Sequence, residues 1–78
     1  MEHMEEVEIM RVSAQTLVPG DVLELEPGVY HVVSTVVTYV TTYSMLGRMT
    51  ISLTVICTET DEVLSVPSSW PVDIVARR

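Results

Sequence analysis

Imidazole or thiol chemistry in this chain would have to come from two histidines and one cysteine. His3 lies in a polar, acidic start, and His31 lies among valines that favour a strand. A lone histidine in such a setting is more often structural than catalytic, because a catalytic imidazole needs partners that orient it. Cys57 ends an alternating apolar row, so we expect a buried, unreactive thiol. A single cysteine also excludes a disulfide within one chain.

Three carboxylates lie close together in the sequence, at Asp21, Glu24 and Glu26. Paired carboxylates can work as acid and base when burial separates their pKa values. Here both glutamates alternate with leucines, a pattern typical of the solvated face of a strand. The sequence shows no Ser-His-Asp order, phosphate-binding glycine loop or metal-spaced cluster. We therefore expect no enzyme, no cofactor, no metal site and no small-molecule substrate.

The aromatic residues indicate protein contact instead, since Tyr and Trp are enriched at interfaces. Both faces of residues 30–43 are apolar or threonine-rich, which is more than one small core can bury. The surplus face indicates a partner or a second subunit, or else a strongly bent strand that serves two halves of a barrel; both interpretations stay open. Trp70 is either a core plug or an interface anchor. The candidate interaction residues are Val37, Tyr39, Val40, Tyr43, Met45, Leu46 and Trp70.

A long β-hairpin over residues 30–57 would position most of these side chains. In its second half, apolar residues occupy every other position, at Met49, Ile51, Leu53, Val55 and Cys57. Only a strand places such a row on one face, which we expect to be the core face. Gly47 suits the connecting turn. If the first half is one regular strand, His31, Val33, Val37 and Tyr39 share a face.

Shorter strands are predicted around this hairpin, at residues 7–12, 22–26, 62–66 and 72–76. Pro19-Gly20 and Pro27-Gly28 favour tight turns, and single helical turns are expected near residues 13–17 and 67–71. Five to six strands in 78 residues indicate an all-β fold, a small antiparallel SH3-like barrel with one or two single-turn 3₁₀ elements. We expect a closed barrel because an open sheet would expose valine-rich edges.

The chain length and charge limit the remaining function classes. Residues 7–78 are long enough for a single domain, while residues 1–6 are expected to fray. Met1 to His3 are either native or an expression remnant, and the sequence leaves both alternatives open. The formal net charge of −7 opposes binding to phosphate backbones, so nucleic acid is a disfavoured partner. No apolar run approaches the ~18 residues of a membrane span, and no signal peptide is visible. A cytoplasmic protein is expected.

Residues 12–22, Val-Ser-Ala-Gln-Thr-Leu-Val-Pro-Gly-Asp-Val, contain the pattern Val-x-Ala-x-x-Leu-x-Pro-Gly-Asp. This pattern resembles the opening of small uncharacterised β-barrel proteins of actinobacteria and of their tailed phages. There too the opening precedes a valine-rich sheet and a late proline-containing segment. The resemblance covers about ten residues in motif and most of the chain in layout, and it implies a small barrel, a phage accessory protein of unknown role.

The sequence predicts a non-enzymatic interaction module that self-associates or docks on a host protein through the hairpin. Adaptable apolar side chains at or just after its tip, Met45, Leu46 and Met49, would help to grip such a partner. The alternative is a nucleic-acid-binding barrel that stacks bases on strand aromatics, which the net charge of −7 disfavours.

Overall fold

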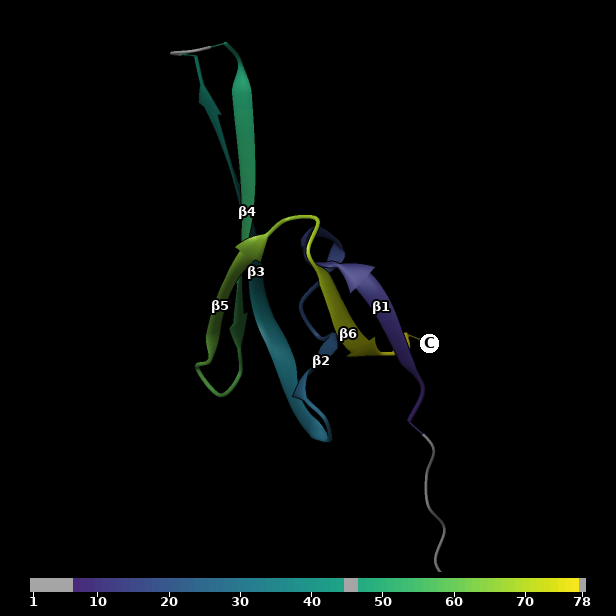
Figure 1. Cartoon of the computed structure of the whole chain (residues 1–78). Helices are drawn as coiled ribbons and strands as arrows, with labels where there is room; N and C mark the ends of the chain where they lie inside the picture. Colours follow the sequence, from purple (N-terminus) through teal and green to yellow (C-terminus); the bar gives the residue numbers. More distant parts are fainter. Residues whose placement is uncertain (1–6, 45–46, 78) are drawn as a thin grey trace, which may run out of the picture.

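The structure, a computed structural model, describes residues 7–44 and 47–77 (Figure 1). Residues 1–6, Met45 and Leu46 lie outside the described residues, so the expectations made for them concern sequence alone. The strands are β1 (Ile9–Ser13), β2 (Val22–Glu26), β3 (Val29–Tyr43), β4 (Met49–Thr58), β5 (Val63–Pro67) and β6 (Pro71–Val75), with one 3₁₀ turn, η1 (Ala14–Thr16). The predicted all-β antiparallel fold is confirmed.

The six strands form one open sheet in the order β1-β6-β2-β3-β4-β5, so the predicted closure into a barrel is wrong. After β5, a turn closed by the Trp70 N–H donating to the Pro67 carbonyl (2.9 Å) leads into β6. β6 then pairs with β1 and β2 instead of β5. Proline has no N–H to donate, and Pro67 and Pro71 stand where β5 and β6 diverge. The helical turn expected near residues 67–71 is therefore an ordinary hydrogen-bonded turn, and η1 is the one 3₁₀ element within the described residues.

A β-bulge at Ser34 divides β3 into two parts that face differently. Val33 lies opposite Thr58, but Thr35 lies opposite Cys57, so β3 has one extra residue. Such a bulge reverses which side chains face the core. Val33 is buried, whereas Val37 and later residues of its row point away from the core. The expectation that His31 and Val33 share a face with Val37 and Tyr39 is therefore wrong.

The core-facing row of β4 is the polar one. Thr54, Ile56 and Thr58 are buried, whereas Met49, Ile51 and Leu53 are exposed. The expectation that the apolar row faces the core is wrong, and Cys57 at its end is half-buried. Threonine can be buried at little cost when its hydroxyl is hydrogen-bonded.

A chain of hydroxyls satisfies these buried polar groups. Thr54 Oγ1 donates to Ser68 Oγ (2.9 Å) and lies 3.0 Å from Thr38 Oγ1, while Ser68 Oγ lies 2.6 Å from Ser52 Oγ. The chain of bonds connects β3, β4 and the turn that follows β5. Within the described residues, no buried side-chain N or O lacks a partner.

Replacing Thr54 by valine should lower the free energy of unfolding by about 1 to 2 kcal/mol. The shape is kept, but the buried Ser68 hydroxyl loses a partner. Chemical denaturation followed by circular dichroism measures the loss. The matched control is Thr50→Val, at an exposed site whose hydroxyl lies 3.4 Å from that of Thr42. A change there as large as at Thr54 would contradict the role of the buried network.

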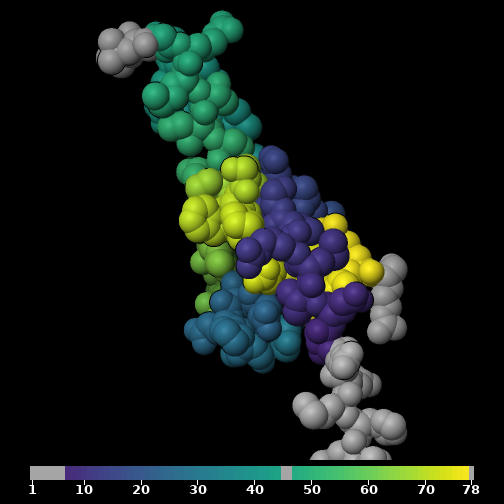
Figure 2. All heavy atoms as spheres, turned by 45° about the vertical axis from the view of Figure 1, so that its right-hand side comes forward, coloured from purple at the N-terminus to yellow at the C-terminus, as the bar shows by residue number. Residues whose placement is uncertain are grey.

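The hydrophobic core is small and lies at one end of the molecule. It is made by Ala14, Leu17, Leu23, Val33, Ile56 and Ile74. We call the part of the chain that surrounds this core the body. The end of the β3–β4 hairpin that is farther from the core projects well beyond the body (Figures 1 and 2). The Cα radius of gyration is accordingly 15.4 Å, against about 11.5 Å for a compact chain of this length.

Candidate interaction surface on the hairpin arm

We call residues 35–43 of β3 and 49–57 of β4 the arm. Its base, at Val36 and Ile56, packs on the core, and the part beyond the β4–β5 pairing projects from the body (Figure 1). Cross-strand partners lie on the same face of a sheet, so the pairing of Tyr39 with Leu53 and of Tyr43 with Met49 defines one face. We call this the outer face, because it is opposite the core. Its members are Val37, Tyr39, Thr41, Tyr43, Met49, Ile51, Leu53 and Val55.

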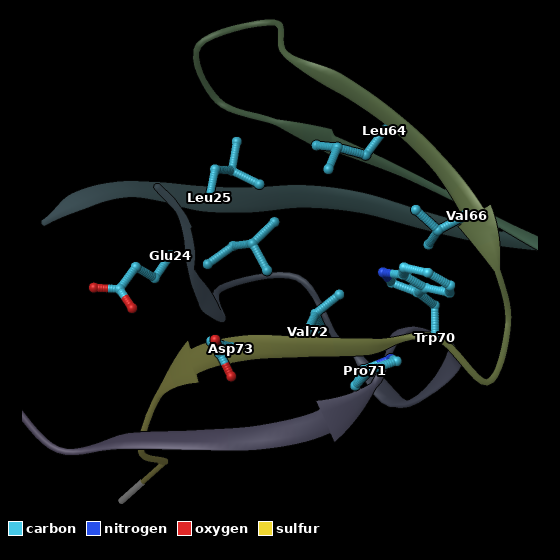
Figure 3. Close-up of a pocket in the computed structure, with 9 residues that line it drawn as sticks. Glu24, Leu25, Leu64, Val66, Trp70, Pro71, Val72 and Asp73 are labelled. Carbon is cyan, nitrogen blue, oxygen red and sulfur yellow. The ribbon is translucent and has the colours of Figure 1, made fainter. Parts of the chain in front are cut away.

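The structure brings three of the predicted interaction residues together on the outer face. Val37, Tyr39 and Tyr43 are exposed there, with Tyr39 at 58%. Val40, exposed at 64%, belongs to the same arm but points to the opposite face. Trp70 lies between β5 and β6, and Figure 3 shows its ring beside Val66 of β5. Of residues 30–43, Val33 and Val36 contribute to the core, whereas the apolar side chains beyond Val36 are exposed. The bent strand was expected to serve two halves of a barrel, and the open sheet has no such halves.

Met49 (60% exposed), which the sequence analysis placed just after the hairpin tip, extends the outer face on β4. Three further apolar residues of this surface were missed: Ile51 and Leu53 on β4, and Val63, which continues the face on β5 opposite Cys57. Their strict alternation was attributed to core burial. The facing of β4 is set by its other row of side chains. Ile56 of that row packs in the core, and the Thr54 hydroxyl is hydrogen-bonded to that of Thr38, so the apolar row is left on the exposed face. The outer face therefore crosses three strands.

The arm also differs from the rest of the chain in charge. The sequence has eleven Asp and Glu residues, and none lies between Gly28 and Glu59. Arg48, next to the arm's tip, is the only Arg or Lys in that interval. The body carries the negative charge, so the arm is the part of the surface that can approach a second acidic copy without like-charge repulsion.

Trp70 lines a groove of about 230 Å³ between β5 and β6, where a closed barrel would have joined (Figure 3). Leu64 and Val66 lie on one side, and Val72 and Trp70 on the other. Trp70 is 55% exposed, so it is not a core plug. Ligand pockets usually have volumes of about 300–1,000 Å³, so this groove suits a single side chain more than a small molecule.

The two carboxylates at the end of this groove already have partners. Asp73 accepts a hydrogen bond from Arg11 Nε (3.0 Å) on the neighbouring strand, and Glu24 accepts one from the Gly28 N–H (3.2 Å). Partial burial, and then the charge of Glu24, raise the pKa of Tyr30, which opposes use of that phenol as a nucleophile. His31 Nδ1 lies 2.9 Å from the Thr60 hydroxyl, a structural contact between β3 and the β4–β5 turn.

Asp21 is buried, which corrects the expectation that it belongs to a solvated row with Glu24 and Glu26. Its carboxylate accepts two hydrogen bonds from Arg77, through Nε (3.0 Å) and Nη2 (2.8 Å), and one from the Val18 N–H (3.0 Å). Arg77 Nη2 also donates to the Thr16 carbonyl (3.0 Å). This cluster joins the segment after β6 to the turn before β2, so it has a structural role.

Within residues 7–44 and 47–77, no group of three or more His, Cys, Asp and Glu side chains could hold a metal ion. No helix in that part of the chain is long and apolar enough to cross a membrane. The arm's outer face, with its exposed apolar side chains, is the candidate functional surface. No family model, no curated protein and no solved structure matches this chain.

Proposed function

We propose that this protein is a non-enzymatic, self-assembling module that associates with a second copy through the outer face of its arm. The observation that supports this most is the exposed apolar row of β4, which continues across the Tyr39–Leu53 pair into β3. Contiguous exposed apolar surface of this kind typically marks an association site. A two-stranded ribbon with both faces in water is also marginal by itself, so a contact that covers the outer face would stabilise the arm.

The charge distribution favours a second copy as the occupant. Two outer faces can stack as the sheets of a β-sandwich do, about 10 Å apart, without bringing carboxylates together. A two-fold axis makes such a contact self-complementary, so one patch suffices. We propose a cytoplasmic setting and, from the resemblance of residues 12–22, a place among the accessory proteins of actinobacteria or their tailed phages.

The test introduces one negative charge on either face of the same strand. Ile51→Glu places a carboxylate on the outer face, and Thr50→Glu places one on the opposite face of the arm. Burying an unpaired charge is costly, so Ile51→Glu should weaken association through the outer face at least tenfold while Thr50→Glu changes it little. Light scattering behind a sizing column, across a concentration series, gives the mass, and circular dichroism confirms folding.

Two results would overturn the proposal. One is a wild-type mass that stays at 8.7 kDa throughout the concentration series. The other is an equal loss of association in the Ile51→Glu and Thr50→Glu variants. That result would show that assembly depends on the charge of the arm and not on burial of its outer face.

A further inference from the structure

β3 has an edge that no described strand covers. β2 pairs with it only over Val29–Val32, and β4 lies along its other side. The last bond on the open side is donated by the Gly20 N–H to the Val33 carbonyl (2.8 Å). From residue 35 to residue 43, the strand therefore presents backbone N–H and C=O groups to its surroundings.

The pairing on the far side of β4 identifies which backbone groups these are. The Ser68 N–H donates to the Ser52 carbonyl (3.0 Å), and the Thr58 N–H donates to the Glu62 carbonyl (3.0 Å), so even-numbered residues of β4 point toward β5. Backbone direction alternates along an antiparallel strand, so odd-numbered residues of β4 bond to β3. Their even-numbered neighbours on β3 then point outward. These outward residues are Val36, Thr38, Val40 and Thr42.

This edge lacks the devices that usually protect an exposed edge strand. Natural edges are short, or carry charges, prolines or bulges that block pairing with another chain. β1, an edge of the sheet, has five residues and includes Arg11, and β5, the other edge, has five and ends in Pro67. Residues 35–43 contain no charge and no proline, and the bulge at Ser34 precedes them. The open edge is therefore built to pair.

We infer that the β3 edge pairs antiparallel with the β3 edge of a second copy, about a two-fold axis at Tyr39. In this register all four outward residues find partners: Val36 pairs with Thr42 of the second copy, and Thr38 with Val40 of the second copy. A shift in either direction would leave outward groups unpaired. The two arms become one four-stranded sheet, and each tip, with Arg48, extends toward the acidic body of the other copy.

This edge contact goes beyond the stacking of outer faces, and neither contact requires the other. Edge pairing places the two outer faces side by side on one sheet and leaves them uncovered. Stacking covers the outer faces and leaves the edges open. Failure of one contact can therefore be distinguished from failure of the other.

The register predicts a specific pattern of disulfide cross-links. Tyr39 of each copy would lie opposite Tyr39 of the other in a non-hydrogen-bonded pair, with Cα atoms about 4.5 Å apart, within the range of a disulfide. Val37 would lie opposite Thr41 of the other copy and about 14 Å along the strand from its own counterpart. A cysteine at position 39 should therefore link to itself, and cysteines at 37 and 41 only to each other.

The experiment uses the full chain with Cys57→Ser, so that each variant has one thiol. Under mild oxidation, Tyr39→Cys should give covalent dimer, while Val37→Cys and Thr41→Cys alone should give at least tenfold less. An equimolar mixture of the last two should restore it. The same pattern is expected when Ile51→Glu is added, because that change acts on stacking. Absence of the Tyr39→Cys dimer, efficient linking of Val37→Cys to itself, or loss of the pattern with Ile51→Glu would overturn the inference.

A matched pair of prolines provides a second measurement. Thr42 and Thr50 are cross-strand partners, both exposed, and each points its N–H outward, but on opposite edges of the arm. Thr42→Pro removes a donor from the β3 edge and should reduce the yield of the Tyr39→Cys dimer at least tenfold. Thr50→Pro should leave the yield unchanged. Equal yields in the two variants would contradict edge pairing.

Discussion

Replacing Ile74 by alanine is expected to lower the free energy of unfolding by about 3 to 4 kcal/mol. Ile74 is fully buried on β6, between β1 and β2, where it lies opposite Met10 and Leu23. Truncating its side chain leaves a cavity in a small core, which has six buried apolar residues among those that the structure describes. A domain of this size has a total stability of about 4–12 kcal/mol. The variant should therefore be largely unfolded at moderate urea concentrations that the wild type withstands.

The matched control deletes the same atoms at the edge of the same sheet. Ile9, on β1, lies opposite Val75 and is exposed, so Ile9→Ala should cost less than about 1 kcal/mol. Urea titrations followed by far-ultraviolet circular dichroism measure both losses. They must be made at one protein concentration, since self-association stabilises the folded state. Similar losses at the two positions would mean that the core does not lie where β6 crosses the body.

The strands and turns could be predicted from the sequence because their causes are local. Alternation at period two and β-branched residues predicted each strand to within one or two residues of its bounds. Pro19-Gly20 gave a turn because Pro fixes φ and Gly20 takes a φ of +98°, which residues with a Cβ rarely adopt. Gly28 acts similarly with a φ of +80°.

The direction in which each strand faces depends on partners far away in the chain, and there the prediction failed. Alternation says that residues share a face but not which face is inside. In β4 the row with threonines is inside because Ser68, from the turn after β5, satisfies the Thr54 hydroxyl. One extra residue at Ser34 was enough to reverse Val37 relative to Val33. Barrel closure failed for the same reason, because it depends on where β6 goes.

The exposure of the candidate interaction residues could be predicted in part. The excess of apolar side chains over what one small core can hold correctly indicated an exposed surface on the hairpin, including Tyr39 and Tyr43. Local composition could not show that Val40 lies on the opposite face of the arm from Tyr39 and Tyr43, because the face depends on the register between β3 and β4. It also could not pair Asp21 with Arg77, which lies 56 residues further along the chain.

The second large effect is expected at Asp21, where alanine should lower the free energy of unfolding by about 3 kcal/mol. The change removes the acceptor of three hydrogen bonds, two of them from a guanidinium, and leaves the Val18 N–H without its partner. The same segment holds β3 in place, because the Val33 N–H donates to the Asp21 carbonyl (2.8 Å). The control is Asp73→Ala. Asp73 pairs with Arg11 and is more exposed than Asp21, so its loss should lower the free energy of unfolding by less than about 1 kcal/mol.

The pH dependence of stability distinguishes loss of this ion pair from a general loss of packing. Hydrogen bonds from Arg77 lower the pKa of Asp21, burial partly opposes this, and the Val18 N–H adds to the lowering. A carboxyl whose pKa is lower in the folded state stabilises the protein above its unfolded pKa of about 3.9, and that contribution is lost as the pH falls through the folded value. The stability difference between wild type and Asp21→Ala should therefore be largest near neutral pH and shrink below about pH 4. A difference that stays constant into acid would mean that the carboxylate contributes by its shape and not by its charge.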